Sequence, residues 1–78
     1  MTKAQIIKIA KASGYLQDHW TSKNLNKFET EDKISLYYIH GDMGLVDKII
    51  YNKINKTIEI YNLNNYYGTT DLVHTIQL

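Results

Sequence analysis

Cysteine and arginine are missing from this chain, and both absences exclude kinds of site. Without cysteine there is no disulfide and no metal site built on thiolates. Without arginine all nine cationic side chains are lysines, and none offers the planar fork that binds guanine or phosphate through two hydrogen bonds. Eight aspartates and glutamates balance the lysines, so the basic excess expected of a strong nucleic-acid-binding domain is missing too.

Long apolar runs are also missing. The apolar stretches are only a few residues long, which excludes a membrane-spanning helix, and the N-terminus lacks the apolar core of a signal peptide. We therefore expect a cytoplasmic protein without a membrane partner. The 78 residues predict a single small domain, 1–78, whose core supplies only about 3–5 kcal/mol net. A dimer mate or a bound target is our hypothesis for the missing stabilisation.

The composition is rich in Ile, Lys, Asn and Tyr and lacks proline as well as arginine. This bias would follow from an AT-rich coding sequence, as in many low-GC bacteria and their phages. It leads us to expect a phage or mobile-element protein, which would act in the cytoplasm of the host cell.

The N-terminal segment has the pattern of a capped amphipathic helix over residues 3–13. Thr2 and Gln5 have the spacing of a capping box, and Ile6, Ile9 and Ala10 recur at helical intervals. Gly14 follows as a stop in the left-handed backbone region. Residues 15–32 are harder to interpret; we expect Ser22 to cap a short helical turn containing Leu25 and Phe28, with Trp20 and Phe28 anchored in the core.

Residues 33–62 predict a three-stranded antiparallel meander with strands 33–40, 45–52 and 57–62. Gly41–Gly44 has the composition of a four-residue turn, which pairs Leu36 with Ile49. A second four-residue turn, 53–56, pairs Ile49 with Ile60; a two-residue turn at 55–56 would mix polar and apolar residues on the buried face. Residues 45–54 also fit a helical stripe, but their β-branched side chains favour a strand.

This register gives the sheet two different faces. The first is apolar, and we expect the N-terminal helix to cover it; it comprises Ile34, Leu36, Tyr38, Ile49, Tyr51, Ile58 and Ile60. The second is mixed and comprises Lys33, Ser35, Tyr37, Ile39, Val46, Lys48, Ile50, Glu59 and Tyr61. The predicted class is thus α+β: an N-terminal helix packed on the meander, with a short C-terminal helix or fourth strand. For residues 69–78 both patterns fit, and we slightly favour the helix.

On the second face, Tyr37, Lys48 and Tyr61 form one predicted cross-strand row. A lysine between two tyrosines allows a cation–π contact, worth roughly 0.5–1 kcal/mol when exposed. Two interpretations stay open: the C-terminal segment folds over this face, or the face is an exposed interface, where tyrosine is enriched. Tyr66 and Tyr67 are adjacent, so in an extended chain at least one points away from the core.

No motif in the chain points to catalysis, a metal or a cofactor. His19, His40 and His74 are far apart, and none has a second ligand at helical spacing. The acidic run Glu29, Glu31 and Asp32 either mimics phosphates for a nucleic-acid-binding partner or is a solvated approach to a strand. We therefore do not expect an enzyme.

The functional hypothesis is a small non-catalytic module that binds and occludes a partner protein. A nucleic-acid-processing complex of the host, such as a defence nuclease, is the partner we expect, which would make the chain an inhibitor of the anti-CRISPR kind. The alternatives are a nucleic-acid-binding module that uses tyrosines and lysines, or a homodimeric subunit. The predicted binding residues are Tyr37, Lys48, Tyr61, Tyr66, Tyr67, Glu29, Glu31 and Asp32.

Overall fold

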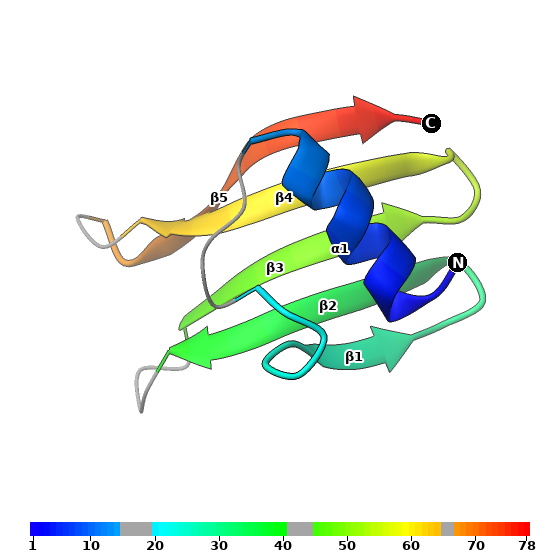
Figure 1. Ribbon diagram of the computed structural model, residues 1–78. Helices are drawn as coiled ribbons and strands as arrows, with labels where there is room; N and C mark the ends of the chain where they lie inside the picture. The colour runs from blue at the N-terminus through cyan, green and yellow to red at the C-terminus, as the bar shows by residue number, and fades with distance from the viewer. Residues whose placement is uncertain (15–19, 41–44, 65–66) are drawn as a thin grey trace.

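The helix α1 (Lys3–Ala12) lies across one face of a five-stranded antiparallel sheet (Figure 1). This computed structural model describes residues 1–14, 20–40, 45–64 and 67–78. The strands follow one another in the sheet in the same order as in the chain, so each hairpin connects neighbours. The elements are α1 (Lys3–Ala12), β1 (Asn26–Glu29), β2 (Lys33–His40), β3 (Leu45–Asn52), β4 (Thr57–Asn64) and β5 (Thr69–Gln77). The predicted α+β class is confirmed, with two strands more than the three of the predicted meander.

The start of α1 is fixed by the capping box that the sequence predicts. The Thr2 hydroxyl accepts a hydrogen bond from the Gln5 amide at 3.2 Å, and the Gln5 side chain accepts one from the Thr2 amide at 2.7 Å. The helix buries Ile6, Ile7 and Ala10 against the sheet. It ends before Gly14, whose φ of 84° lies in the left-handed region that glycine adopts without strain.

The predicted register of the three central strands is confirmed. Leu36 lies opposite Ile49, and Ile49 lies opposite Ile60, so the helical alternative for residues 45–54 is wrong. The predicted turn Gly41–Gly44 lies outside the described residues, although the flanking His40 and Leu45 pair as expected. In the second turn, the Asn52 side chain accepts hydrogen bonds from the amides of residues 54 and 55, at 3.0 and 2.9 Å. That asparagine closes the four-residue connection that the sequence predicts.

The core lies between α1 and the sheet face that α1 covers. Trp20 and Leu25 complete it, and the tryptophan side chain is only 1% exposed, as expected for an anchor. Tyr38 and Ile9 are partly buried against it. The buried residues are Ile6, Ile7, Ala10, Trp20, Leu25, Ile34, Leu36, Ile49, Tyr51, Ile58 and Ile60.

The prediction for residues 22–28 is wrong. The turn is capped by Thr21 instead of Ser22: the Thr21 hydroxyl accepts from the amide of Asn24 at 3.2 Å. The chain then extends into β1, where Phe28 lies opposite Ser35. Because Ser35 points away from α1, the register also turns Phe28 outward, and its side chain is 61% exposed instead of anchored in the core.

The helix favoured for residues 69–78 is also wrong, because this segment is the strand β5. Ile76 pairs with Ile58 and His74 with Ile60, and the next pair joins Leu72 to Tyr61. Val73 is therefore the extra residue of a β-bulge. The open edge of β4 provides the backbone partners that an isolated short helix would lack. Since β5 lies in the plane of the sheet, the C-terminal segment does not cover the second face.

Candidate interaction surface

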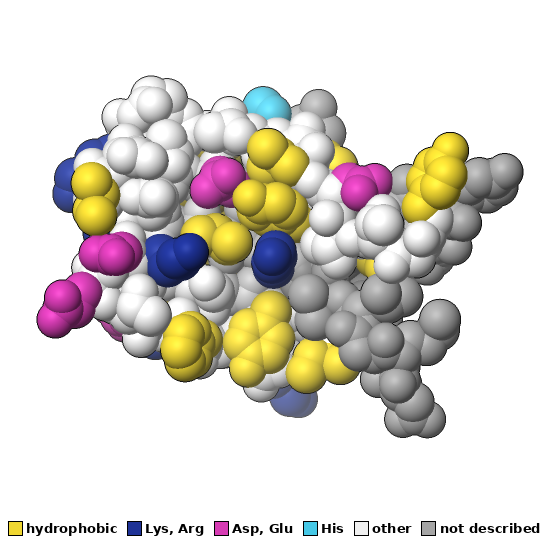
Figure 2. All heavy atoms as spheres, turned by 180° about the vertical axis from the view of Figure 1, so that it is seen from behind, with side chains coloured by type: hydrophobic (Ala, Val, Ile, Leu, Met, Phe, Trp, Pro, Cys, Tyr) yellow, Lys and Arg dark blue, Asp and Glu magenta, His cyan; other side chains and the backbone are white. Residues whose placement is uncertain are grey.

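The face of the sheet opposite α1 is called the outer face below. Side chains on a strand alternate between the two faces, so the register assigns every second residue to this face. Figure 2 shows it from behind, with hydrophobic side chains gathered around lysines and acidic side chains beside them. The side chain of Val46, predicted here, lies outside the described part. The outer face comprises Asn26, Phe28, Lys33, Ser35, Tyr37, Ile39, Lys48, Ile50, Asn52, Thr57, Glu59, Tyr61, Leu63, Thr70, Leu72, Thr75 and Gln77.

The predicted row on this face is confirmed and extends across all five strands. Tyr37 lies opposite Lys48, and Lys48 lies opposite Tyr61. On the two outer strands, Asn26 continues the row beside Tyr37, and Leu72 continues it beside Tyr61. We call these five residues the central row. Sequence reasoning found its three middle members, because their strands carry clear turn signals.

Contacts within the outer face hold Tyr61 in place. The Lys48 ammonium lies 4.8 Å from the centre of the Tyr61 ring, in the cation–π position that the sequence predicts. The Tyr61 hydroxyl donates a hydrogen bond of 3.0 Å to the Glu59 carboxylate. Burial raises the pKa of Tyr61, and the Glu59 carboxylate raises this pKa further. The phenol therefore stays neutral at physiological pH, and its ring has a fixed orientation.

Large apolar side chains in the central row and beside it face solvent. Phe28 is 61% exposed, Leu72 52% and Ile39 50%. Sequence reasoning missed Phe28 and Leu72 as surface residues, because neither β1 nor β5 was predicted as a strand with this register. The alternation of Leu72, His74 and Ile76 predicts a strand but places Leu72 on the wrong face, because the bulge at Val73 puts Leu72 on the outer face while His74 and Ile76 lie on the α1 side.

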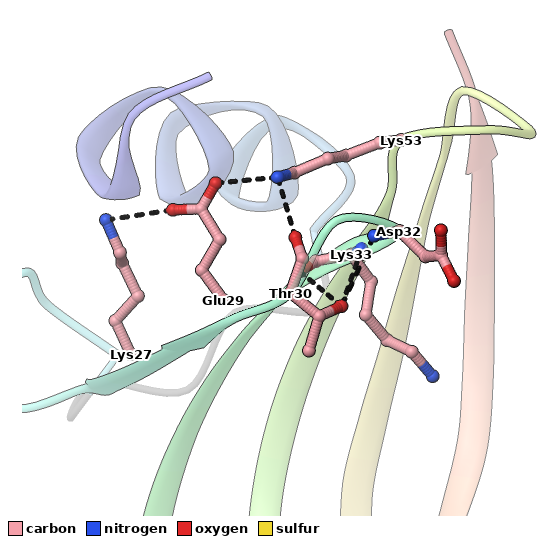
Figure 3. Close-up of polar contacts among 6 residues, drawn as sticks. All are labelled: Lys27, Glu29, Thr30, Asp32, Lys33 and Lys53. Atoms are coloured by element: carbon pink, nitrogen blue, oxygen red, sulfur yellow. Dashed lines mark hydrogen bonds and ion pairs between the residues drawn. The ribbon is translucent and has the colours of Figure 1, made fainter.

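The acidic run does not lie together on the outer face. Glu29 pairs with Ile34 and therefore points to the α1 side of the sheet. Its carboxylate accepts from Lys53 at 2.7 Å and forms an ion pair with Lys27 at 3.4 Å (Figure 3). Hydrogen bonding and charge from Lys53, and to a smaller extent from Lys27, lower the pKa of Glu29. These contacts indicate a structural role for Glu29.

Lys53 connects two turns that are distant in the chain. Besides Glu29, its ammonium donates to the backbone carbonyl of Thr30 at 2.8 Å (Figure 3). Its backbone amide donates to the carbonyl of Asp32 at 2.8 Å. The β1–β2 turn is thereby fixed to the start of the β3–β4 turn. Asp32 and its neighbour Glu31 are exposed in that β1–β2 turn.

The remaining predicted binding residues are two adjacent tyrosines. Tyr66 lies outside the described residues. Tyr67 is exposed in the turn that precedes β5. The structure therefore brings three of the eight predicted residues, Tyr37, Lys48 and Tyr61, together in one row, and it places Glu29 and Tyr67 elsewhere.

The described residues contain no pocket and no group of three or more His, Asp or Glu side chains that could hold a metal. Within the same part of the chain, no helix has the length and apolar character needed to cross a membrane. Comparison with protein-family models, curated proteins and solved structures finds no match for this chain. The outer face is the feature on which a functional argument can be built.

Proposed function

We propose that this chain is a non-catalytic binding protein that occupies the surface of a partner protein through its outer face. The observation that carries the proposal is the exposure of Phe28, Ile39 and Leu72 on one regular sheet face. Exposed apolar side chains that gather on one face of a protein often mark a site of protein–protein interaction. Aromatic residues at the centre of such a patch are typical of the side chains that contribute most of the energy of protein–protein association.

The charges of the outer face support the same proposal. Only Lys33, Lys48 and Glu59 are charged among its described side chains. Lys48 and Glu59 both contact Tyr61, so their charges are partly balanced within the face. A low density of charged groups is characteristic of the core of protein interfaces, and the lysine at the centre of this face, Lys48, is held against the Tyr61 ring.

The outer face is built on regular paired strands, which favours binding. Its side chains project from the paired strands of one sheet, and the β1–β2 and β3–β4 turns are tied together through Lys53. A surface that is already ordered loses less conformational entropy on association than a mobile one. This favours a module that acts by occlusion, with the whole face meeting a complementary surface.

The proposed partner is a nucleic-acid-processing complex of a bacterial host, such as a defence nuclease. This part of the proposal rests on the AT-rich coding bias, with its excess of Ile, Lys, Asn and Tyr and its lack of arginine. The chain would then be an inhibitor encoded by a phage or mobile element.

A single-stranded nucleic acid is the second candidate ligand, and one observation favours it. The strand β1 adds Phe28 to Tyr37 and Tyr61, so three aromatic rings and two lysines share the outer face. Bases stack on such rings, at about 1–3 kcal/mol each, while lysines neutralise phosphates. We rank it second because the net charge is only +1 and Glu59 places a carboxylate among the rings.

Affinity capture from a low-GC bacterial lysate separates the two candidates. The immobilised chain is incubated with one half of the lysate as prepared and with another half digested by nuclease. A protein retained in stoichiometric amount from both halves is the result that we expect. Retention that disappears after nuclease digestion, together with oligonucleotide affinity that falls steeply with salt, would instead favour nucleic acid.

A further inference from the structure

The strand β5 forms a long open edge of the sheet. It is the last strand in the sheet order, and in the described part of the chain it pairs with a strand, β4, on one side only (Figure 1). The backbone amides and carbonyls on the other side of an edge strand are available to pair with another chain. Leu72 and Val73, at the middle of this edge, are 52% and 37% exposed.

The two edges of the sheet differ in their protection. Natural proteins shield an edge by making it short or by adding lysine, proline or a bulge. The strand β1 is four residues long and carries Lys27 and Glu29, which are held in ion pairs. The strand β5 has nine residues, mostly β-branched or apolar, and contains no lysine or proline. Its one irregularity is the bulge at Val73.

We propose that two copies of this chain associate through β5, antiparallel across a two-fold axis, to form one continuous ten-stranded sheet. Antiparallel pairing of one strand with its own copy is the isologous contact that a two-fold dimer requires. The net charge of +1 on each chain gives little repulsion between the copies. The new interface would also provide stabilisation that a core of this size lacks.

The bulge restricts the register of this pairing. Because Val73 is an extra residue, Asp71 and His74 lie on the same face of the sheet, as shown by their pairing with Asn62 and Ile60. When β5 pairs with β5 of a second copy, only two registers set residues of the same sheet face opposite each other along most of the strand. One of them places the Asp71 carboxylate opposite Ile76 of the second copy, which leaves an acidic group against an apolar side chain.

The other register is the one we infer, with the two-fold axis between Leu72 and Val73. It places these two exposed apolar side chains against each other and sets Asp71 opposite His74 of the second copy. Asp71 already accepts a 2.8 Å hydrogen bond from the Thr69 hydroxyl, which fixes its carboxylate. Thr70 then lies opposite Thr75 of the second copy, a cross-strand pair that suits a sheet.

Sedimentation equilibrium from low micromolar to near-millimolar concentration tests the dimer. We expect the wild-type mass to rise from 9.1 kDa towards twice that value. Val73→Lys introduces a charge at the two-fold axis and should give the monomer mass throughout, while Phe28→Lys on the outer face should still dimerise. A monomeric wild type, a dimer that survives Val73→Lys, or a dimer lost only in Phe28→Lys would overturn the proposal. Far-UV circular dichroism identifies any variant that fails to fold.

Engineered cysteines test the register independently, because the sequence has no cysteine of its own. Opposite residues on antiparallel strands have Cα atoms about 4.5–5.5 Å apart, within the range that a disulfide spans. An oxidised mixture of Thr70→Cys and Thr75→Cys should form the mixed disulfide dimer, and neither variant alone should form much. If the mixed disulfide is no more abundant than the disulfide dimer of either variant alone, this register is wrong. That conclusion holds whether or not sedimentation shows a dimer.

Discussion

Truncation of two isoleucines on opposite faces tests whether the core lies only on the α1 side of the sheet. Ile49 in β3 is fully buried, whereas Ile39 in β2 is 50% exposed on the outer face. Replacing isoleucine by alanine removes three carbons, worth about 2.4 kcal/mol when fully buried. With the cavity left behind, Ile49→Ala should lower the free energy of unfolding by roughly 2–5 kcal/mol. Ile39→Ala should lower it by only about 1 kcal/mol.

Urea denaturation measures both values. The protein has one tryptophan, and because Trp20 is 1% exposed its fluorescence reports the opening of the core, while circular dichroism reports the sheet. A chain whose core supplies about 3–5 kcal/mol should be marginal or unfolded after Ile49→Ala. The urea concentration at the unfolding midpoint should fall, while the slope of the unfolding free energy against urea concentration stays unchanged. Equal destabilisation by the two variants would refute the assignment of the faces, since it would mean that the outer face is buried as well.

Three smaller predictions concern turns and charges. Lys56 has a φ of 57°, so Lys56→Gly should raise the free energy of unfolding by roughly 0.5–1 kcal/mol in urea titrations. The lowered pKa of Glu29 means that the unfolded chain binds more protons near pH 4; stability therefore falls on acidification, and Glu29→Gln should make this acid-induced loss shallower. The raised pKa of Tyr61 has the opposite sign: folded chains retain this proton above pH 10, so stability falls as pH rises further, and Tyr61→Phe should flatten that alkaline limb. Thermal melts across pH measure how stability depends on pH in the acid range and in the alkaline range. A variant with the same pH dependence as the wild type would contradict the corresponding prediction.

The central hairpins could be predicted from the sequence because two signals agree there. Turn length and the alternation of apolar residues both place Ile49 between Leu36 and Ile60, and a slip by one residue would expose that whole apolar set. The helix α1 was predictable for a similar reason, since Thr2 and Gly14 mark both of its ends. The capping and turn residues are local, so their effect can be read without knowledge of the rest of the fold.

The outer strands could not be predicted with the same security, because tertiary pairing determines them. The strand β1 has only four residues, and its segment resembles a capped turn until β2 offers a backbone partner. In β5 the bulge at Val73 interrupts the alternation, so Leu72, Val73 and Ile76 imitate a helical stripe. The central row was therefore predictable in its middle, whereas Phe28 and Leu72, which enlarge the exposed apolar surface, were not.

Affinities of two matched variants test the role of the outer face most directly. Phe28 and Ile54 are both large, apolar and exposed, at 61% and 70%, but Ile54 lies in the β3–β4 turn and outside the outer face. Binding of the captured partner is measured by calorimetry for the wild type, Phe28→Lys and Ile54→Lys. We predict that Phe28→Lys weakens binding at least tenfold, about 1.4 kcal/mol, and that Ile54→Lys leaves it unchanged. Equal affinity of all three proteins, or loss only in Ile54→Lys, would contradict the account.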